Sequence, residues 1–531
     1  MKLPLTPIRC LYRGVDLYGQ KVGVISGACR YTYAEFGERC ERLSAGLLHE
    51  GVQRGDRVAF LSFNNNQLLE GYYGAPLIRA MVMPLNVRLS AGELTAILNH
   101  AEARVLVFET DFAPMVEKLR ALCPSIERWV SIDGPSPQAD LTYDDLLSHG
   151  RIDRPDICSF DEDEIAELFY TSGSTGTPKG VMLAHRTLYL HAMAVACAFN
   201  RDDTAVELHT IPLFHANGWG RPQTAVMNGI KQVMVRRFEP VSVLRIVAEE
   251  RATAMSLVPT MANSLINCPE LGKHDTSSLL EIHVGGAAAA PELIGHLEKA
   301  FPSARVMAGY GLTETCPVAT SARTKGTVKY ADEADRIRHM AMAGWPILGC
   351  EIRVVDLHMN DVARDMSAIG EVVIRGDNVM DGYFKEPAAT QAVMSGAWLH
   401  TGDMAVWDAE NYIHIVDRKK DIIISGGENI SSIEVEKAIC AHPAVLECAV
   451  VAAPDPKWGE VPAAVVVVKP GQQLDGAGLM EFLSGRLAGF KCPRVVDFAA
   501  DPLPKTGTGK ILKRQLREAY WQGKDVRVGQ A

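Results

Sequence analysis

The sequence has no paired-cysteine motif, no long apolar run and no excess of basic residues, and each absence excludes a class of protein. Its 12 cysteines are scattered between Cys10 and Cys492, without a CxxC pair or clustered histidines. This pattern excludes a zinc ribbon and a disulfide-built secreted scaffold. No uncharged apolar run reaches the roughly 18 residues that a membrane-spanning helix needs. We therefore expect a cytoplasmic protein in a reducing setting, with no integral membrane segment.

The charge balance argues against a nucleic-acid partner. The chain has 54 Lys and Arg against 64 Asp and Glu, a formal net charge of −10. A protein that neutralises many phosphates along a nucleic acid needs the opposite excess. Any site for a polyphosphate must therefore be local.

The length and the pattern of apolar residues indicate a globular α/β protein with more than one domain. The chain has 531 residues, 47% hydrophobic and 22% charged, which is ordinary soluble usage and too long for one usual domain. Short β-branched runs alternate with amphipathic stretches, as in layered folds with largely parallel sheets. Expected strands lie at 57–61, 104–108 and 232–235, and expected helices at 33–50 and 91–101, the latter with Ser90 as N-cap.

The pattern changes at the charged segment 417–421, which we interpret as a hinge. A small α+β unit follows it, with helices expected at 432–440 and 476–487 and strands at 446–452, 463–468 and 495–498. We therefore predict a large domain over 1–417, of layered sheets and helices, and a small α+β domain over 418–531.

The most informative segment is the run of small and hydroxylic residues at 170–180, Tyr-Thr-Ser-Gly-Ser-Thr-Gly-Thr-Pro-Lys-Gly, between two apolar strands. Glycines let backbone N–H groups approach a phosphate, hydroxyls add donors, and Lys179 adds positive charge. The spacing is not that of a Walker A loop, because Pro178 precedes the lysine. A flexible turn is the alternative, but so long an ordered pattern favours a phosphate loop.

With this segment the sequence resembles the adenylate-forming superfamily of acyl-CoA synthetases, luciferases and peptide-synthetase adenylation domains. Other segments match that family's motifs in the same order. They are 310–314 (Tyr-Gly-Leu-Thr-Glu), 401–403 (Thr-Gly-Asp), 417–421 with 425–429, and 504–510 (Pro-Lys-Thr-Gly-Thr-Gly-Lys).

The resemblance implies ATP, Mg²⁺ and coenzyme A as cofactors, and a carboxylic acid as substrate. The residues that it assigns to cofactor binding are Thr171, Ser172, Gly173, Ser174, Thr175, Gly176, Lys179, Gly286, Ala287, Gly309, Tyr310, Gly311, Thr313, Asp403, Arg418, Gly426 and Gly427. Tyr310 offers a face on which adenine can stack. Asp403 and Arg418 would bind the ribose, and Gly426 and Gly427 would line the path of the CoA arm. For each residue, a structural or solvated role is the alternative.

Three residues carry the predicted catalysis: Lys510, His215 and Glu314. The resemblance places Lys510 on the carboxylate and the α-phosphate, where an ammonium can offset the repulsion between two reacting anions. Glu314 is a hard oxygen ligand for Mg²⁺, with Thr175 as helper. His215 would lie between the acyl group and the adenylate and gate the thiol, although a core histidine is the alternative.

The acyl group is the least determined part of the prediction. The segment 211–219, which ends in Asn-Gly-Trp, is similar to that of medium-chain fatty acyl-CoA synthetases, and 284–290 would line the acyl pocket or simply pack closely. No acid stands after Phe214 to recognise an amino acid. Lys420 occupies the hinge position where many relatives carry aspartate.

We therefore predict an AMP-forming acyl-CoA synthetase for a medium-chain fatty or related acid, with a small domain that rotates between half-reactions. The alternatives are an aryl-CoA ligase, a ligase that loads carrier-protein phosphopantetheine, a luciferase-like oxygenase and a nucleotide-binding protein without turnover. No carrier domain follows within the chain, which favours free CoA as acceptor. A homodimer is compatible with the resemblance, since dimers are common among relatives.

Overall fold

The computed structural model describes residues 2–171, 178–426, 428–505 and 511–522. Contacts divide the chain into two compact units. The large unit comprises Met1–Ile352, Val373–His400 and Glu410–Ile413, and the small unit comprises Arg353–Val372, Thr401–Ala409 and His414–Ala531. The chain thus passes between the units several times before residue 414, and the functional boundary after residue 417 stays a prediction. No helix in the described ranges is both long and apolar enough to cross a membrane.

An eight-stranded sheet of order β19-β9-β8-β4-β3-β5-β6-β7 forms one half of the large unit. The pairs among β3 to β8 are parallel, and β9 pairs antiparallel with both β8 and β19. Its strands are β3 (Arg57–Leu61), β4 (Met81–Pro84), β5 (Val105–Phe108), β6 (Arg128–Ser131), β7 (Leu141–Thr142), β8 (Ile165–Thr171), β9 (Lys179–Ala184) and β19 (Gly382–Tyr383).

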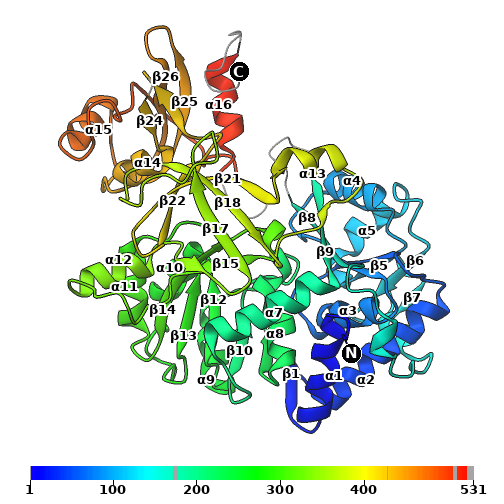
Figure 1. Ribbon diagram of the computed structural model, residues 1–531. Helices are drawn as coiled ribbons and strands as arrows, with labels where there is room; N and C mark the ends of the chain where they lie inside the picture. The colour runs from blue at the N-terminus through cyan, green and yellow to red at the C-terminus, as the bar shows by residue number, and fades with distance from the viewer. Residues whose placement is uncertain (1, 172–177, 427, 506–510, 523–531) are drawn as a thin grey trace. The chain divides into compact units, whose positions relative to one another are not determined.

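This sheet is buried on both faces, and side chains alternate between two cores. Val105 and Val107 of β5 belong to one core, and Leu106 and Phe108 belong to the other. In Figure 1, α4 and α5 lie on one side of β5, and α1, α2 and α3 lie on the other. These helices are α1 (Pro7–Tyr18), α2 (Tyr33–His49), α3 (Asn66–Leu77), α4 (Ala91–Ala101), α5 (Ala113–Arg120) and, on the α2 side, α6 (Tyr143–Leu147). Burial on both faces explains the continuous apolar runs in the sequence.

A nine-stranded sheet of order β16-β15-β14-β13-β12-β10-β11-β1-β2 forms the other half of the large unit. Its centre is parallel and its two ends are antiparallel. Its strands are β1 (Val22–Ser26), β2 (Cys29–Thr32), β10 (Val206–His209), β11 (Lys231–Met234), β12 (Ala254–Leu257), β13 (Glu281–Val284), β14 (Arg305–Gly311), β15 (Val318–Ser321) and β16 (Trp345–Pro346). The helices of this half are α7 (His185–Phe199), α8 (Arg221–Met227), α9 (Pro240–Glu250), α10 (Pro259–Ile266), α11 (Pro291–Ala300) and α12 (Glu333–Met340).

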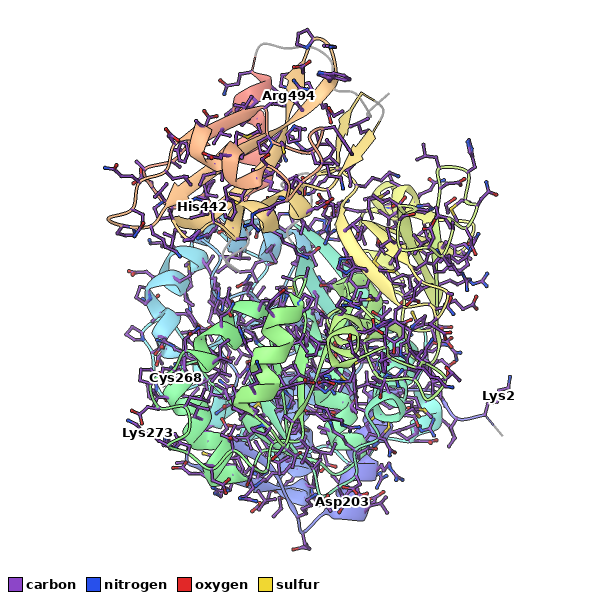
Figure 2. The ribbon with its side chains drawn as sticks, turned by 90° about the vertical axis from the view of Figure 1, so that its left-hand side faces the viewer. Lys2, Asp203, Cys268, Lys273, His442 and Arg494 are labelled. Atoms are coloured by element: carbon purple, nitrogen blue, oxygen red, sulfur yellow. The ribbon has the colours of Figure 1, made fainter. Side chains whose placement is uncertain are left out.

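Two five-stranded sheets complete the fold. The first holds residues of both units, with β17 (Cys350–Val355), β18 (Gly370–Gly376), β20 (Met394–Ser395), β21 (Trp398–Trp407) and β22 (Ile413–Arg418), and is accompanied by α13 (Pro387–Val393). The second belongs to the small unit, with β23 (Ile423–Ser425), β24 (Glu428–Ile430), β25 (Val445–Asp455), β26 (Gly459–Val468), β27 (Val495–Phe498) and helices α14 (Ser432–Cys440), α15 (Gly476–Leu483) and α16 (Lys513–Trp521). In Figure 2, Cys268 and Lys273 mark the large unit, and His442 and Arg494 mark the small one.

The predicted α/β class is confirmed, and most predicted elements lie within a few residues of their expected ends. Ser90 caps α4 as expected, because its hydroxyl accepts from the Glu93 N–H and Glu93 reaches back to the Ser90 N–H. The helix expected to run to Leu487 is wrong at its end. It stops at Leu483, because Ser484 leaves helical geometry and Gly485 has φ +76°.

The packing of α2 on α6 depends on one glycine. A Cβ at Gly46 would lie 2.0 Å from the Leu146 carbonyl oxygen, so the two helix backbones approach as closely as a missing side chain allows. The end of α2 is therefore held at a fixed place against the end of α6.

We expect Gly46→Ala to destabilise the protein by at least about 1–3 kcal/mol, because the added methyl group forces these helices apart. The urea midpoint of unfolding measures this loss. Gly92→Ala in α4 is the matched control, since a Cβ there meets nothing within 4 Å. Equal midpoints for the two variants would contradict the close approach.

Candidate functional site

The segment 170–180, predicted to be a phosphate loop and called the phosphate-loop segment below, is anchored by a hairpin. Thr171 at the end of β8 is the register partner of Lys179 at the start of β9. The two described ends of the segment therefore lie side by side. The predicted residues Ser172, Gly173, Ser174, Thr175 and Gly176 lie outside the described residues.

A tyrosine that the sequence prediction missed connects Lys179 with Glu314. The Lys179 ammonium lies 4.8 Å from the centre of the Tyr383 ring, and the Tyr383 hydroxyl donates to Glu314 Oε1 at 2.9 Å. Burial, and then the charge of Glu314, raise the pKa of Tyr383, so its hydroxyl stays a neutral donor. Two residues that were predicted from separate motifs are thus brought together by a third.

Strand pairing fixes this arrangement. Tyr383 of β19 is the register partner of Val181 in β9. Glu314 lies in the short 3₁₀ helix Thr313–Thr315, and its carbonyl oxygen accepts from the Met380 N–H at 2.9 Å. Both ends of the Tyr383–Glu314 hydrogen bond are therefore held by backbone contacts.

The glycines around Tyr310 are required by a close approach of two strands. Tyr310 of β14 pairs with Thr320 of β15, and a Cβ at Gly311 would lie 1.7 Å from the Pro317 carbonyl oxygen. A Cβ at Gly309 would lie 3.1 Å from the Thr320 carbonyl oxygen. The sequence prediction assigned these glycines to cofactor binding, and the strand contact is a second reason for them.

The segment after β13 lies beside both β14 and a tryptophan. A Cβ at Gly285 would lie 3.0 Å from the Trp219 ring and 3.3 Å from the Gly309 carbonyl oxygen, and Gly286 has φ +75°. Gly286 and Ala287 are exposed. A Cβ at Gly286 would lie 3.7 Å from the same indole ring, so residues 285 and 286 lie beside Trp219.

His215 begins a strained turn. The five following residues, Ala216 to Gly220, all have positive φ, including the non-glycine residues Ala216 (46°), Asn217 (51°) and Trp219 (60°). A run of left-handed residues is costly for L-amino acids, and such strain concentrates at functional sites. His215 itself is exposed, yet the protein atoms around its ring, and then the charge of Arg88, lower its pKa, so the imidazole is neutral at pH 7.

A buried polar network lies between this turn and the phosphate-loop strand. The Gln223 amide donates to Glu167 Oε1 at 2.7 Å and to Asn217 Oδ1 at 3.2 Å. All three side chains are buried, and burial raises the pKa of Glu167 far above its usual value. Burial thus favours the uncharged form of the Glu167 carboxyl group, which connects β8 to the left-handed turn. Its position in an apolar strand was the sequence signal that could have identified it.

The predicted ribose residues meet in the small unit. Arg418 Nε lies 2.5 Å from Asp403 Oδ1. Glu371, which the sequence prediction missed, accepts from the Gly402 N–H at 3.1 Å and from the Lys419 ammonium at 3.0 Å. Glu371 thus holds the turn before Asp403 and the residue after Arg418.

The segment around the predicted hinge is bonded within the small unit. The Asp417 carboxylate accepts from the Ser432 N–H at 2.5 Å and the Ser432 hydroxyl at 2.6 Å, at the start of α14, whose N-cap is Ser431. The Lys420 carbonyl oxygen accepts from Arg517 of α16, and burial lowers the pKa of the Lys420 ammonium. These bonds hold both ends of the segment 417–420.

Three residues of the small unit were predicted to act in the second half-reaction or in catalysis: Gly426 and Gly427 beside the CoA arm, and Lys510 as the catalytic lysine. Gly426 has φ +60°, and a Cβ there would lie 2.6 Å from the Trp458 ring. Gly427 and Lys510 lie outside the described residues. Lys505 and Ile511, on either side of 506–510, form an antiparallel bridge.

We expect Glu167→Gln to be at least as stable as the wild type at pH 7. A carboxyl group whose pKa is raised by folding binds more protons in the folded state, so its contribution to stability falls as pH rises above about 4.3, by at most about 1.4 kcal/mol per pH unit. Glutamine does not titrate, and its advantage over wild type should grow across this range. Urea unfolding at several pH values measures it.

Glu70→Gln is the matched control, at a buried glutamate that forms an ion pair with Arg39. Glu70 accepts from Arg39 at 2.6 Å and from the Tyr143 hydroxyl at 2.7 Å, so breaking this buried pair should cost about 3 kcal/mol. A comparable loss in Glu167→Gln at pH 7 would show that Glu167 is ionised.

Comparison with known proteins identifies the family of this chain. A family model described as AMP-binding enzyme matches residues 11–384, and one described as AMP-binding enzyme C-terminal domain matches residues 434–510. The chain is 38% identical over 522 residues to a long-chain-fatty-acid–CoA ligase of Thermus thermophilus, covering 96% of this chain and 94% of that protein.

Two solved structures have the same fold. An anthranilate CoA ligase in complex with anthranoyl-AMP matches with a TM-score of 0.85 and 25% identity, covering 98% of both chains. ATP-bound MatB from Rhodopseudomonas palustris matches with a TM-score of 0.85 and 27% identity, covering 98% of this chain and 99% of that one. The chain therefore belongs to the AMP-binding enzyme family, on the acyl-CoA synthetase branch of the adenylate-forming superfamily.

Proposed function

We propose that this protein is an AMP-forming acid–thiol ligase that converts a carboxylic acid to acyl-AMP and pyrophosphate and then transfers the acyl group to CoA, releasing AMP. The observation that carries the proposal is the contact of Lys179 with Tyr383 and of Tyr383 with Glu314. It brings a cation and an acid from two nucleotide motifs to one place. ATP and CoA are the cofactors that family membership supports.

In the first half-reaction, the carboxylate of the substrate attacks the α-phosphate of ATP, and pyrophosphate leaves. Lys179 would bind phosphate oxygens beside the loop, and Lys510 would offset the negative charge that develops between the two reacting anions. Asp403 would accept from the ribose hydroxyls, and Arg418 would donate to them. Tyr310 would stack on adenine, between the close-packed glycines Gly309 and Gly311.

Glu314 is the described residue that would hold Mg²⁺, with Thr175 as its helper. Its half-buried carboxylate is oriented by the Tyr383 hydroxyl and offers the oxygen ligands that Mg²⁺ prefers. A bound Mg²⁺ would neutralise phosphate charge. Tyr383 keeps the Glu314 side chain in one orientation and remains neutral.

In the second half-reaction, the CoA thiolate attacks the acyl carbonyl carbon and AMP leaves. His215, neutral at pH 7, would lie beside the reacting carbonyl group and gate the thiol, and Gly426 and Gly427 would line the path of the CoA arm. A rotation of the small domain about Lys420 would exchange the two active arrangements, since one site must first stabilise phosphoryl transfer and then admit a long thiol.

The acid is a medium-chain fatty or related acid in this proposal. Gly286 lies beside Trp219. Gly286 and its exposed neighbours Ala287 and Ala288 are small, which would leave volume for an apolar group. An aromatic acid is the second candidate, because a structural neighbour of this chain holds anthranoyl-AMP. Cytoplasmic location and a homodimer complete the proposal.

We expect carboxylate-dependent exchange of labelled pyrophosphate into ATP, and a fall of about 100- to 1000-fold in Lys510→Ala, the usual effect of removing a group that stabilises transition-state charge. Lys491→Ala is the control, because this small-unit lysine pairs with Glu434 at 2.7 Å. Full exchange in Lys510→Ala would overturn the role of the lysine.

The same assay over a panel of acids, with CoA or a holo-carrier protein as acceptor, tests the rest of the proposal. Thioester on CoA supports a CoA ligase, and the preferred acid separates fatty from aryl substrates. Acylated carrier protein would instead indicate a ligase that loads a carrier protein, and light emission would indicate a luciferase-like oxygenase. Nucleotide binding without exchange would indicate a binding protein without turnover.

We expect Tyr383→Phe to lower kcat/KM for ATP by about ten- to a hundredfold, because a hydrogen bond to a charged group contributes about 1.5–3 kcal/mol. Steady-state kinetics at saturating acid and CoA measure the effect. Tyr330→Phe is the control, since it removes a hydroxyl 3.2 Å from that of Tyr412 in the same unit. Wild-type kinetics in Tyr383→Phe would show that Glu314 needs no such support.

A further inference from the structure

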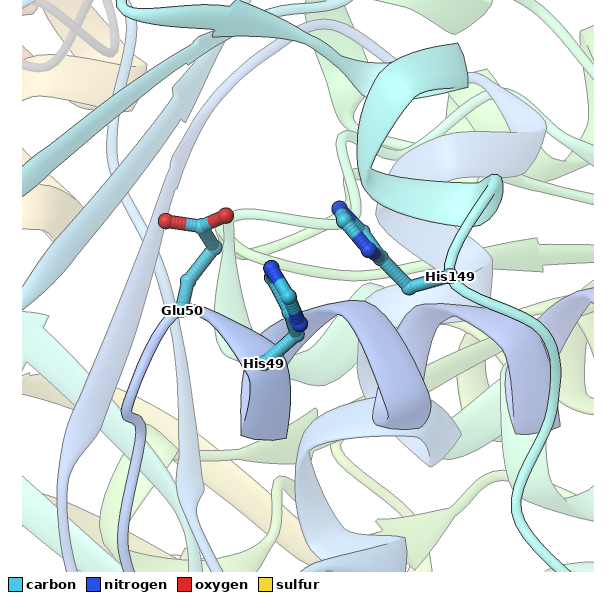
Figure 3. Close-up of side chains that lie close together, drawn as sticks. All are labelled: His49, Glu50 and His149. Carbon is cyan, nitrogen blue, oxygen red and sulfur yellow. The ribbon is translucent and has the colours of Figure 1, made fainter.

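We propose that His49, Glu50 and His149 form a binding site for one divalent transition-metal ion, best suited to Zn²⁺. One ligand atom from each of the three residues lies within 4.8 Å of the others. Figure 3 shows the His49 ring and the Glu50 carboxylate at the end of one helix, with the His149 ring of another segment beside them. This site is separate from the nucleotide residues and does not rest on the proposed function.

The fold holds the backbone of the three ligand residues in place. His49 is the last residue of α2 and Glu50 is its C-cap, while His149 follows α6 by two residues. Gly46, one turn before His49, packs against the Leu146 carbonyl group, so the two helix ends have one relative position. Ligands on closely packed helix ends are partly organised before an ion binds.

The helix end and the Glu50 carboxylate attract a cation, against the positive charge of Arg128, which pairs with Glu50. The C-terminal end of a helix carries a partial negative charge, which stabilises positive charge near its last turn. Glu50 is mostly buried, and its Oε2 accepts from the Arg128 guanidinium. A partner of this kind orients a ligating carboxylate.

The two imidazole rings are close enough to share an ion. Their centres are 3.8 Å apart and their planes differ by 17°. Two nitrogens on one tetrahedral Zn²⁺ lie about 3.3 Å apart, given Zn–N distances of about 2.0–2.1 Å. Both histidines are exposed, so their rings can turn toward a common ion.

The ligand set selects the class of ion. Two imidazole nitrogens and one carboxylate suit Zn²⁺, whereas Mg²⁺ prefers oxygen ligands alone. A water molecule would complete the tetrahedron. Since the ion would join α2 to the segment after α6, its binding should stabilise the folded large unit.

Titration of the tag-free, full-length protein with Co²⁺ tests the site, because Co²⁺ replaces Zn²⁺ and gives visible absorption bands. We expect one Co²⁺ per chain, displaced by Zn²⁺ but not by millimolar Mg²⁺. His49→Ala and His149→Ala should each weaken binding at least tenfold. His296→Ala, at an exposed histidine of α11 in the same unit, should bind like the wild type.

Thermal unfolding gives a second measurement on the same proteins. Zn²⁺ should raise the unfolding midpoint of the wild type and of His296→Ala, and leave those of His49→Ala and His149→Ala unchanged. Metal-free midpoints show whether each variant is folded, and Glu50→Gln gives a further variant that keeps both histidines. Absence of saturable binding, or equal affinity in all variants, would overturn the proposal.

Discussion

The antiparallel pairing of β9 with β8 on one side and with β19 on the other is the constraint on which the candidate nucleotide site depends. The first pairing places Lys179 opposite Thr171, and the second places Tyr383 beside the same strand. The Tyr383 hydroxyl then donates to Glu314, which lies about 70 residues earlier in the chain. A single strand of six residues thus sets the positions of three polar groups from three parts of the sequence.

The second half of the site depends on a strained turn. The positive φ angles of Ala216, Asn217 and Trp219 each carry a cost of about 1–2 kcal/mol. Buried contacts offset this cost, because Gln223 binds Asn217 and Glu167, and the Trp219 ring packs on Gly285. Hydrogen bonds from Gln223 to Glu167 of β8 and to Asn217 therefore hold the turn that follows His215. β8 is also the strand that leads into the predicted phosphate loop.

Local signals in the sequence predicted the local features of this protein. Ser90 with Glu93 predicted the start of α4, and the segment 432–440 predicted α14. The predicted end of α15 was wrong. The helix stops before its apolar pattern does, because Ser484 leaves helical geometry and Gly485 has a positive φ. The motifs predicted Lys179, Glu314, Asp403 and Arg418, and the structure brings the first two, and the last two, together. Tyr383 and Glu371 were missed because each contacts a residue distant in sequence, and no local spacing marks such a contact. Glu167 was missed although its place in an apolar strand marked it.

The hydrogen bonds around Lys420 bear on the proposed rotation of the small domain. The Asp417 carboxylate accepts from the Ser432 N–H at the start of α14, and the Lys419 N–H donates to the Gly402 carbonyl group. The Lys420 carbonyl group accepts from Arg517 of α16. All of these partners belong to the same compact unit. A rotation about Lys420 would therefore have to break the hydrogen bonds that Asp417, before the pivot, accepts from Ser432, after it.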